Sequence, residues 1–338
     1  MTTLRVIDVA PGVTVQDMGR PGWVARGLAR GGAADRLALL EAAALLGQAQ
    51  PLAALEMAGA GGRFTVDAPV RLCLTGARMK AEVEGRPLGH CETALLAPGE
   101  VLRVGGAEAG NYGYLAFAGG VFGDEWLGSR AAHLLAGVGK LLAAGDELAV
   151  GRDDDPDAAA QVLEPESRLG GGTLRVMPGP QTELFAQEVR ARFFATGFHR
   201  APQANRQGVR LDFEGEPFES ETKGLASDFI ASGDIQMTGD GRPYVLLAES
   251  QTVGGYPRIG TVIAADLPRL AQAQAGEALQ FQPVTLEEAD AAWENEAAVL
   301  ARLKQSVAPR VRDPHDIPDL LGYQLVDGAT KGDELEDE

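Results

Sequence analysis

Polar residues gather with glycines at several points of the sequence, and the first such cluster contains Gln16, Asp17 and Arg20 and ends at Asp35. The glycines between them let the backbone approach a ligand or a neighbouring segment closely. The side chains offer hydrogen-bond donors and acceptors of opposite charge, which suits recognition of a small polar molecule. The alternative interpretation is structural, with Asp17 or Asp35 paired to Arg20 beside a capped helix.

A second cluster with possible chemistry contains Asn205, Arg206 and Arg210 on strand-like sequence. The two arginines stand four residues apart, so we expect their side chains on the same face of a strand. Two guanidiniums on one face of an acidic protein indicate a site for a carboxylate or another anion, because arginine binds oxyanions bidentately. The alternative is that they form ion pairs with Asp212 or Glu214.

A third candidate is the joint between two strand-like runs, 244–248 and 261–264, which is longer than a hairpin requires. Its paired glycines would let the main chain line a cleft, and its polar side chains would offer hydrogen bonds to an amide-like substrate. The alternative is a wide structural connection that packs on a partner protein. The candidate contacts in this joint and in the remaining polar clusters are Arg130, Gln236, Gln251, Thr252, Gly254, Gly255 and Tyr256.

Strands are the main elements that would position these clusters. The 44 glycines and 19 prolines are scattered among short apolar runs, which is typical of many tight turns between short strands. Helical patterns are fewer and cover 33–46, 182–192, 268–274 and 286–305. The candidate strands are Leu4–Val9, Arg71–Thr75, Ala81–Val83, Glu100–Val104, Tyr112–Ala118, Glu147–Val150, Thr173–Val176, Val209–Asp212, Tyr244–Ala248, Thr261–Ala264 and Ala278–Phe281.

A change of composition predicts where the chain divides. At 338 residues the chain exceeds the usual size of one domain, so two domains are expected. An aspartate-rich and then glycine-rich stretch, 153–171, has the composition of a linker. It separates a first β-domain, 1–152, from a second, 172–285. Residues 286–338 are expected to form a C-terminal helix and an acidic tail.

The formal net charge of -18 bounds the possible partners. Such a field repels phosphate backbones and anionic lipid headgroups, so binding to nucleic acid or to a membrane surface is disfavoured. The two cysteines are too few for a disulfide framework. The N-terminus has no basic-then-apolar signal pattern, and no apolar run approaches the roughly 20 residues of a membrane helix. We therefore expect a cytoplasmic protein.

Several familiar motifs fail when their spacing is checked. The segment 137–141 resembles a phosphate loop but lacks its first glycine and its hydroxyl residue. Lys80 follows a methionine, but the second methionine expected after a biotin-carrying lysine is absent, so no covalently bound biotin is expected. No metal site is predicted, because the histidines lack ligand spacing and neighbouring cysteines; they are His90, His133, His199 and His315. No catalytic residue is assigned, because no Ser or Cys lies in a nucleophile-elbow pattern.

Many ordered motifs along residues 4–285 carry a resemblance to a known family. They are Gln16-Asp-Met-Gly-Arg20, Gly31-Gly-Ala-Ala-Asp35, Leu55-Glu56, Tyr114-Leu-Ala-Phe-Ala-Gly-Gly120, Gly128-Ser-Arg130, Pro178-Gly-Pro-Gln181, Asn205-Arg-Gln-Gly-Val-Arg-Leu211, Ile235-Gln236 and Gln251-Thr-Val-Gly-Gly-Tyr-Pro257. In this order they resemble the allophanate hydrolase subunit 2 family, which is also known as the family of the 5-oxoprolinase C subunit or as biotin-dependent carboxyltransferase-like.

This resemblance implies a mainly β fold with two cyclophilin-like β-barrel domains, a few helices and a C-terminal helix. It implies two partners: a homologue of the B subunit, from the allophanate hydrolase subunit 1 family, and a homologue of the A subunit. The implied activity is hydrolysis of the lactam of 5-oxo-L-proline to L-glutamate, with a small amide as substrate. ATP is implied at the level of the complex, and the chain alone is expected to be inactive.

Two other functions follow from the same resemblance. One is transfer of a carboxyl group from an external carboxybiotin to urea or a related amide. The other is regulation, by binding a kinase-inhibitor-like homologue of the B subunit. The sequence lacks a fused biotin carboxylase and a biotin carrier, which favours the 5-oxoprolinase interpretation.

The sequence departs from the family pattern at three places. Gln207 stands where methionine is usual, Glu249-Ser250 replaces a common Asp-Arg pair, and 231–234 differs from the usual Gly-Ala. The change at 249–250 removes a positive side chain beside Gln251. The identity of the substrate is therefore less constrained than the fold.

Overall fold

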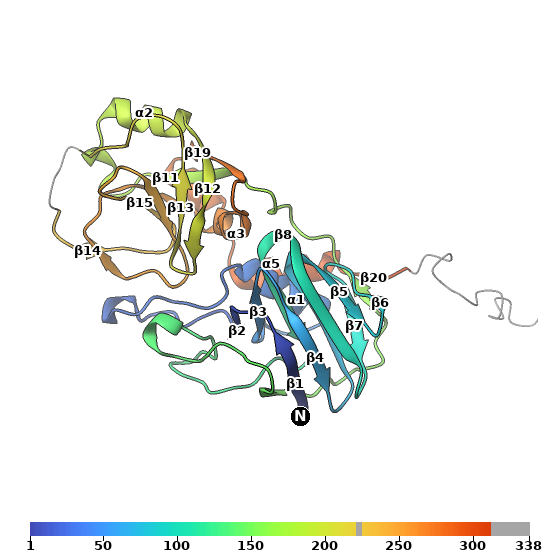
Figure 1. The fold of residues 1–338 in the computed structure, drawn as a ribbon. Coiled ribbons are helices and arrows are strands. Elements are labelled where there is room, and N and C mark those ends of the chain that lie inside the picture. The colour runs from blue at the N-terminus through green and yellow to red at the C-terminus, as the bar shows by residue number, and fades with distance from the viewer. Residues whose placement is uncertain (221–224, 312–338) are drawn as a thin grey trace, which may run out of the picture.

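The computed structural model describes residues 1–220 and 225–311 and shows two β-domains side by side (Figure 1). The expected mainly β fold with a few helices is confirmed. Apolar side chains form separate cores, one within the sheet of the first domain and one inside the second domain. The short helix α3 (Leu267–Gln272) contacts strands of both domains and lies between them.

The first domain is a half-barrel built on one nine-stranded sheet. Its two longest strands, β5 and β8, pair with each other along most of their length, with irregular register between Gly76 and Ala81. Each replaces two shorter predicted strands, because the glycines that interrupt the sequence pattern lie within continuous strands. The strands are β1 (Thr2–Val9), β2 (Val13–Gln16), β3 (Ala54–Ala58), β4 (Gly62–Val66), β5 (Val70–Val83), β6 (Arg86–Pro87), β7 (Thr93–Leu96), β8 (Val101–Phe117) and β9 (Glu147–Val150).

Helix α1 (Arg36–Leu45) covers one face of this sheet. The Asp35 side chain caps its N-terminus by accepting a hydrogen bond from the Ala38 amide at 3.2 Å. The rich supply of Ala and Leu favours the helix, and nearly all of its residues are buried. The Thr75 hydroxyl of β5 donates to the Ala38 carbonyl at 2.8 Å, which fixes the helix on the sheet.

The second domain is a closed barrel of seven strands. Its core is rich in phenylalanine, and the ring of Phe193 stacks on that of Phe281 at 5.0 Å between centroids. The predicted helix 182–192 is instead a 3-10 turn, Thr182–Leu184, followed by α2 (Gln187–Ala195). In barrel order the strands are β11 (Gly172–Met177), β18 (Arg258–Val262), β15 (Asp234–Met237), β16 (Pro243–Leu246), β13 (Gly208–Asp212), β12 (Gly197–Asn205) and β19 (Ala278–Pro283).

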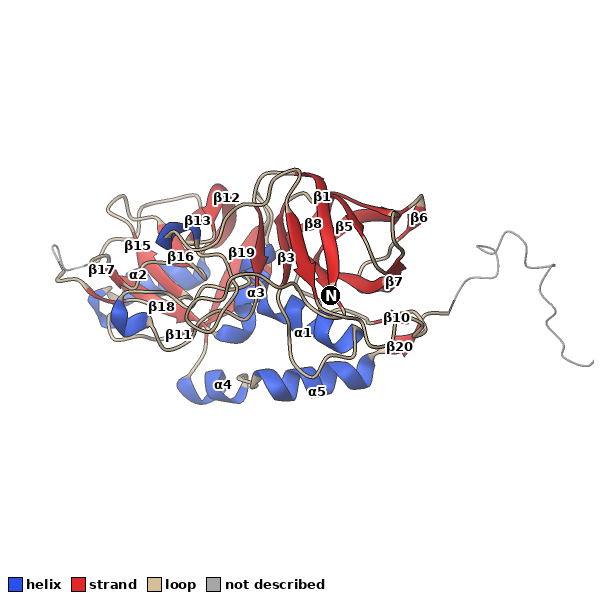
Figure 2. Ribbon diagram, turned by 90° about the horizontal axis from the view of Figure 1, so that it is seen from below, coloured by secondary structure: helices blue, strands red, loops and turns tan. Residues whose placement is uncertain are grey.

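The predicted C-terminal helix 286–305 is two helices, α4 (Leu286–Ala291) and α5 (Glu296–Ser306). Thr285 begins α4 through a capping box with Glu288, and Asn295 caps α5 by accepting from the Ala298 amide at 2.9 Å. The first helix ends at Ala291, before this second cap, so one periodic stretch gives two helices. Figure 2 shows α5 beside α1, and these two helices are in contact.

The segment predicted as a linker is anchored to the first domain. Asp153 accepts hydrogen bonds from Arg71, and the buried Arg168 binds residues of α1 and its cap. Two short ribbons complete the described chain: β10 (Gln161–Val162) with β20 (Ala308–Pro309), and β14 (Asp228–Phe229) with β17 (Val253–Gly254). The predicted acidic tail within 286–338 lies outside the described residues, which end at 311.

Within the part of the chain that the structure describes, no helix has the length and apolar composition of a membrane span.

Candidate functional site

Arg206 joins the two domains through a buried ion network. It lies in the turn between β12 and β13, and its guanidinium reaches the first domain, where Nη1 pairs with Glu56. Its Nε donates to Glu249 Oε1 at 2.6 Å, and Nη2 donates to the Gly32 carbonyl. Burial works to lower the pKa of Arg206, but the two carboxylates outweigh burial and raise the pKa. The arginine therefore stays charged and holds the domain junction together.

Arg206 and Arg210 do not share one face, and that prediction is wrong. Arg206 leaves the strand pattern because it occupies the turn, whereas Arg210 lies on β13 and projects from the second barrel. Arg210 instead lies near two carboxylates, with Nε 3.8 Å from Asp212 Oδ1 and Nη2 3.6 Å from Asp240 Oδ2. The two guanidiniums therefore do not form one anion site.

Arg20 is fully buried beside the same junction. Its Nη2 donates to the Ala131 carbonyl at 2.5 Å, and its guanidinium lies 5.5 Å from the ring centroid of Trp126. Its Nη1 has no hydrogen-bond partner among residues 1–220 and 225–311. Burial lowers the pKa of Arg20, while Asp17 and Glu249 oppose that shift.

Asp17 holds residues 129–130, which precede the Ala131 carbonyl that Arg20 binds. One carboxylate oxygen accepts from the Gly19 amide at 2.8 Å and from the Ser129 hydroxyl at 2.6 Å, and the other accepts from the Arg130 amide at 2.7 Å. The Arg130 side chain itself pairs with Glu125 at 3.1 Å. Asp17 therefore has a positioning role and does not pair directly with Arg20.

Asp35 belongs to a buried ion network away from Arg20. Arg168 donates to Asp35 at 2.7 Å and to Glu41 at 2.7 and 2.6 Å, and Gln272 donates to Asp35 at 2.9 Å. Burial raises the pKa of Glu41 although Arg168 opposes the shift. Asp35 therefore has the structural role given as the alternative interpretation, since it caps α1 and forms an ion pair. Its partner is Arg168 and not Arg20.

His133 also lies at the junction, and the sequence pattern did not single it out. Its side chain is buried, and Nδ1 accepts from the Ala136 amide at 3.3 Å. Its Nε2 has no hydrogen-bond partner within the described chain. Burial lowers the pKa of His133, while Glu249 works against that shift. Its nearest signal in the sequence is the adjacent Gly128-Ser129-Arg130 motif.

Two glutamines are also buried: Gln16 near the domain junction and Gln236 in the second barrel. Gln16 donates to the Thr14 hydroxyl at 3.0 Å and to the Ala132 carbonyl at 3.1 Å. Gln236 lies on β15, and a Cβ added at Gly254 would approach its Nε2 to 2.8 Å. In the described residues, Gln16 Oε1 and Gln236 Nε2 are buried without hydrogen-bond partners.

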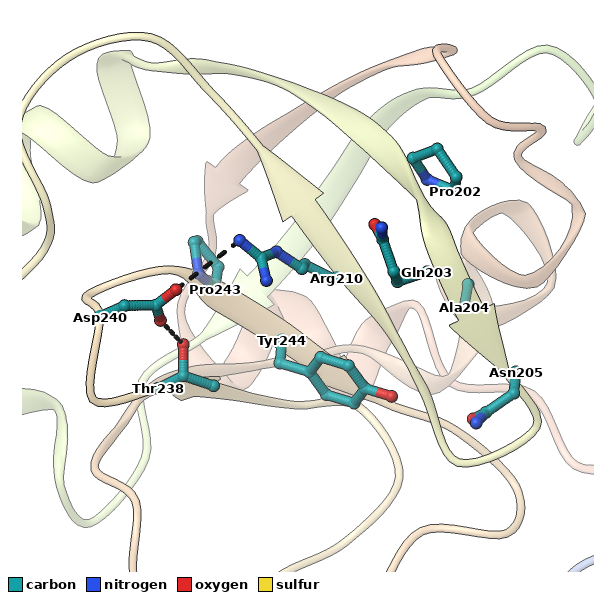
Figure 3. Close-up of a pocket in the computed structure, with 9 residues that line it drawn as sticks. All are labelled: Pro202, Gln203, Ala204, Asn205, Arg210, Thr238, Asp240, Pro243 and Tyr244. Atoms are coloured by element: carbon teal, nitrogen blue, oxygen red, sulfur yellow. Dashed lines mark hydrogen bonds and ion pairs between the residues drawn. The ribbon is translucent and has the colours of Figure 1, made fainter.

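A cleft of about 470 Å³ lies on the second barrel, and Figure 3 shows its lining. Arg210 points toward Asp240 across the cleft, and the ring of Tyr244 lies below them. Asn205 stands at one end, where its Oδ1 accepts from the Gln207 amide at 2.8 Å. Since Asp240 offsets Arg210, the one arginine of the lining, this cleft suits a neutral polar ligand better than an anion.

The joint at 251–257 divides between two environments. Thr252 is buried and lines a groove of about 760 Å³ between the domains, together with Gly31, Ala248 and Ser250. Val253 and Gly254 form β17, which pairs with β14. Gln251 is exposed, and Tyr256 is about half exposed at 48%. Gly255 follows β17 directly. Of residues 251–257, Thr252 alone lines the groove.

Metal binding finds no support in the described ranges, because no three His, Cys, Asp or Glu side chains there group as ligands. The residues brought together at the junction are Gln16, Arg20, His133, Arg206, Glu56 and Glu249. Guanidinium, imidazole and amide groups bind and orient polar ligands. These six side chains do not line the groove themselves, but Gly31, which does line it, lies against Arg20 and His133.

Solved structures share the fold of this chain. The Kluyveromyces lactis urea carboxylase superposes with a TM-score of 0.80 at 22% identity, over 92% of this chain and 31% of that chain, which shows the fold. The protein TTHA0988 superposes with a TM-score of 0.75 at 30% identity, and the match spans 83% of this chain and 56% of that one. This chain therefore shares its fold with part of each of these larger proteins.

The family follows from the sequence comparison. The carboxyltransferase domain family, subdomains A and B, matches residues 26–283, and the chain belongs to it. Two relatives are named as the C subunit of 5-oxoprolinase: the Haemophilus influenzae protein is 30% identical over 295 residues, and the Escherichia coli protein is 32% identical over 293 residues. Each match covers 85% of this chain and 93% of the relative. A putative urea carboxylase of Emericella nidulans is 30% identical over 84% of this chain and 25% of its own length.

Proposed function

We propose that the chain is the C subunit of an ATP-dependent 5-oxoprolinase complex. With homologues of the A and B subunits it would open the lactam of 5-oxo-L-proline to L-glutamate in the cytoplasm. The observation that carries the proposal is the extent of the match, since 93% of each of the two 5-oxoprolinase relatives aligns with this chain. Only 25% of the putative urea carboxylase does so.

The junction supports a role in binding and orienting the substrate. Arg20 and His133 lie against Gly31, which lines the groove, and guanidinium and imidazole groups can stabilise charge that develops on a carbonyl oxygen. We assign attack on the lactam and the use of ATP to the complex and not to this chain alone. No residue of the chain is assigned to ATP.

The test is reconstitution with the A and B subunits and measurement of glutamate released from 5-oxo-L-proline. We expect release that requires ATP and all three chains. Thr252→Val keeps the size of a groove residue while removing its hydroxyl, and Gln251→Ala alters an exposed neighbour as a control. Release that is unchanged when this chain is omitted would refute the proposal.

Carboxyl transfer is the second candidate, because the family is named for it and a relative carries the name urea carboxylase. That function would need an external carboxybiotin. Consumption of urea that depends on a biotinylated partner and is blocked by avidin would favour it. A stable pairing with the B subunit that turns over no amide would instead indicate a regulatory protein.

A further inference from the structure

The groove between the domains is lined by an arginine whose hydrogen-bond donors are not used within the described chain. Three arginines and three glutamates line this groove of about 760 Å³ among mainly apolar side chains. Arg36, the first residue of α1, is one of these arginines, and its side chain is 32% exposed. In residues 1–220 and 225–311 its guanidinium makes no hydrogen bond, and its one ion pair, with Glu296, spans 3.8 Å. Its donors are therefore available to a bound molecule.

Arg36 shares its only carboxylate with Arg30. Arg30 Nη2 donates to Glu296 Oε1 at 2.8 Å, and Arg36 Nη1 lies 3.8 Å from the same oxygen. Within the described residues, no other carboxylate oxygen lies within 4.0 Å of either guanidinium. One negative charge therefore faces two positive charges, which leaves a local excess of one positive charge at this part of the groove.

The third arginine of the groove has no such excess. Arg302 Nη1 pairs with Glu166 at 2.6 Å, and Arg302 Nη2 pairs with Glu294 at 3.0 Å. Two carboxylates thus bind one guanidinium, so the charge around Arg302 repels an anion. We therefore expect an anionic group in the groove to bind at Arg36 and not at Arg302.

The surroundings of Arg36 favour a carboxylate as the bound group. Burial and the neighbouring charge of Arg30 lower the pKa of Arg36, while Glu296 opposes that shift. Arginine nevertheless stays charged at pH 7. A partly desolvated guanidinium gains more from an anion than one in open water, because the effective dielectric constant is lower. Its planar fork of donors matches the two oxygens of a carboxylate.

Apolar side chains from both domains line the same groove. Leu37 and Leu40 of α1 line it on the first domain, and Ile230 and Leu247 line it on the second. Removing the CH₂ groups of a small ring from water against such walls is favourable. The groove therefore suits a small carboxylic acid with a partly apolar ring. It suits urea less well, because urea has neither a charge nor an apolar part.

We propose that Arg36 binds the carboxylate of a small cyclic acid whose ring lies in the groove between the domains. The inference rests on the proposed function for the choice of 5-oxo-L-proline, which has a lactam ring and a carboxylate. That carboxylate keeps its charge while the lactam opens, so Arg36 would bind the ground state and the transition state equally. Arg36 is then a substrate-binding residue that determines specificity, and not a catalytic residue.

The experiment is calorimetric titration of the full-length chain, and of its complex with the A and B subunits without ATP, with two lactams. They are 5-oxo-L-proline and 2-pyrrolidinone, which has the same ring without the carboxylate. Arg36→Gln should weaken binding of 5-oxo-L-proline about tenfold, as expected for loss of a charge-assisted hydrogen bond, and should leave binding of 2-pyrrolidinone unchanged. Arg152→Gln is the matched control, because Arg152 also forms a 3.8 Å ion pair, with Asp154, but does not line the groove.

Glu296→Gln provides a second test with the opposite sign. This exposed substitution removes the negative charge that competes for Arg36, so binding of 5-oxo-L-proline should become tighter. Weaker binding of 5-oxo-L-proline to this variant would overturn the inference. Equal loss of both lactams in Arg36→Gln would do the same, and so would a lack of 5-oxo-L-proline binding to both the chain and the complex.

The two proposals fail in different ways. In glutamate release by the complex, Arg36→Gln should raise KM for 5-oxo-L-proline about tenfold with little change in kcat, because the carboxylate takes no part in ring opening. An unchanged KM would overturn the role of Arg36 while the proposed function stands. If the complex releases no glutamate but Arg36→Gln abolishes a preference for 5-oxo-L-proline over 2-pyrrolidinone, the proposed function fails and the carboxylate site stands.

Discussion

Replacing Arg206 with alanine removes the guanidinium that joins the two domains. The side chain is 14% exposed, and its partners Glu56 and Glu249 are 1% and 6% exposed, so the variant leaves two nearly buried carboxylates uncompensated. Breaking a buried ion pair by deleting one partner costs about 3–5 kcal/mol, because the remaining charge stays desolvated. We expect Arg206→Ala to lower the free energy of unfolding by about that amount.

The assay is urea unfolding followed by circular dichroism. Arg302→Ala is the control, because Arg302 also pairs with two carboxylates, Glu166 and Glu294, but all three side chains are at least 40% exposed. Exposed pairs contribute about 0–1 kcal/mol. The reasoning would be refuted if the two variants lost stability to within about 1 kcal/mol of each other.

A double variant separates the loss of the ion pair from the cost of leaving buried carboxylates without a partner. Arg206→Ala with Glu249→Gln removes one of the two uncompensated charges while keeping the shape of the side chain. Its free energy of unfolding should therefore exceed that of Arg206→Ala alone. A further loss in the double variant would show that burial of charge is not the cause.

Three further outcomes test other parts of the structure. Burial raises the pKa of the Cys73 and Cys91 thiols, so a thiol reagent at pH 7 should label them only after unfolding, and rapid labelling of the folded chain would contradict their burial. The pKa of Asp153 is lowered. Burial alone would raise it, but hydrogen bonds from Arg71 and from backbone amides outweigh burial. Its stabilisation is therefore present above the unfolded-state pKa and lost as the pH falls through the folded-state pKa, and Asp153→Asn should flatten that acid loss in urea unfolding. Phe193→Ala should cost about 3–5 kcal/mol in the same assay, since the ring is fully buried among aromatic neighbours, and a loss below about 1 kcal/mol would contradict its place in the core.

Local sequence rules predicted the fold class well, because turns and helix caps are short-range features. The helix at 33–46 agrees closely with α1, since Asp35 and the Ala-rich sequence act within one turn. The rules failed where tertiary pairing overrides local preference: β5 continues through Gly76, although glycine usually weakens a strand. Likewise, Asn295 begins a new helix within a stretch that reads as continuous.

The candidate site could be predicted only in part, because its contacts join distant segments. Glycine-rich motifs identified Arg20 and Arg206, yet the partner of Arg206 in the first domain, Glu56, lies 150 residues away. His133 carries no local spacing signal, and its neighbour at Gly31 belongs to another motif. Arg210 was misplaced for the opposite reason, since a strand period was assumed across a turn.

The central claim is that this chain completes a 5-oxoprolinase. The most direct measurement follows glutamate formed from 5-oxo-L-proline and ADP formed from ATP by the A and B subunits, with and without this chain. Coupled formation of glutamate and ADP only when the chain is present is the expected result. Equal glutamate formation in its absence, or ADP release without glutamate in the full complex, would contradict the claim.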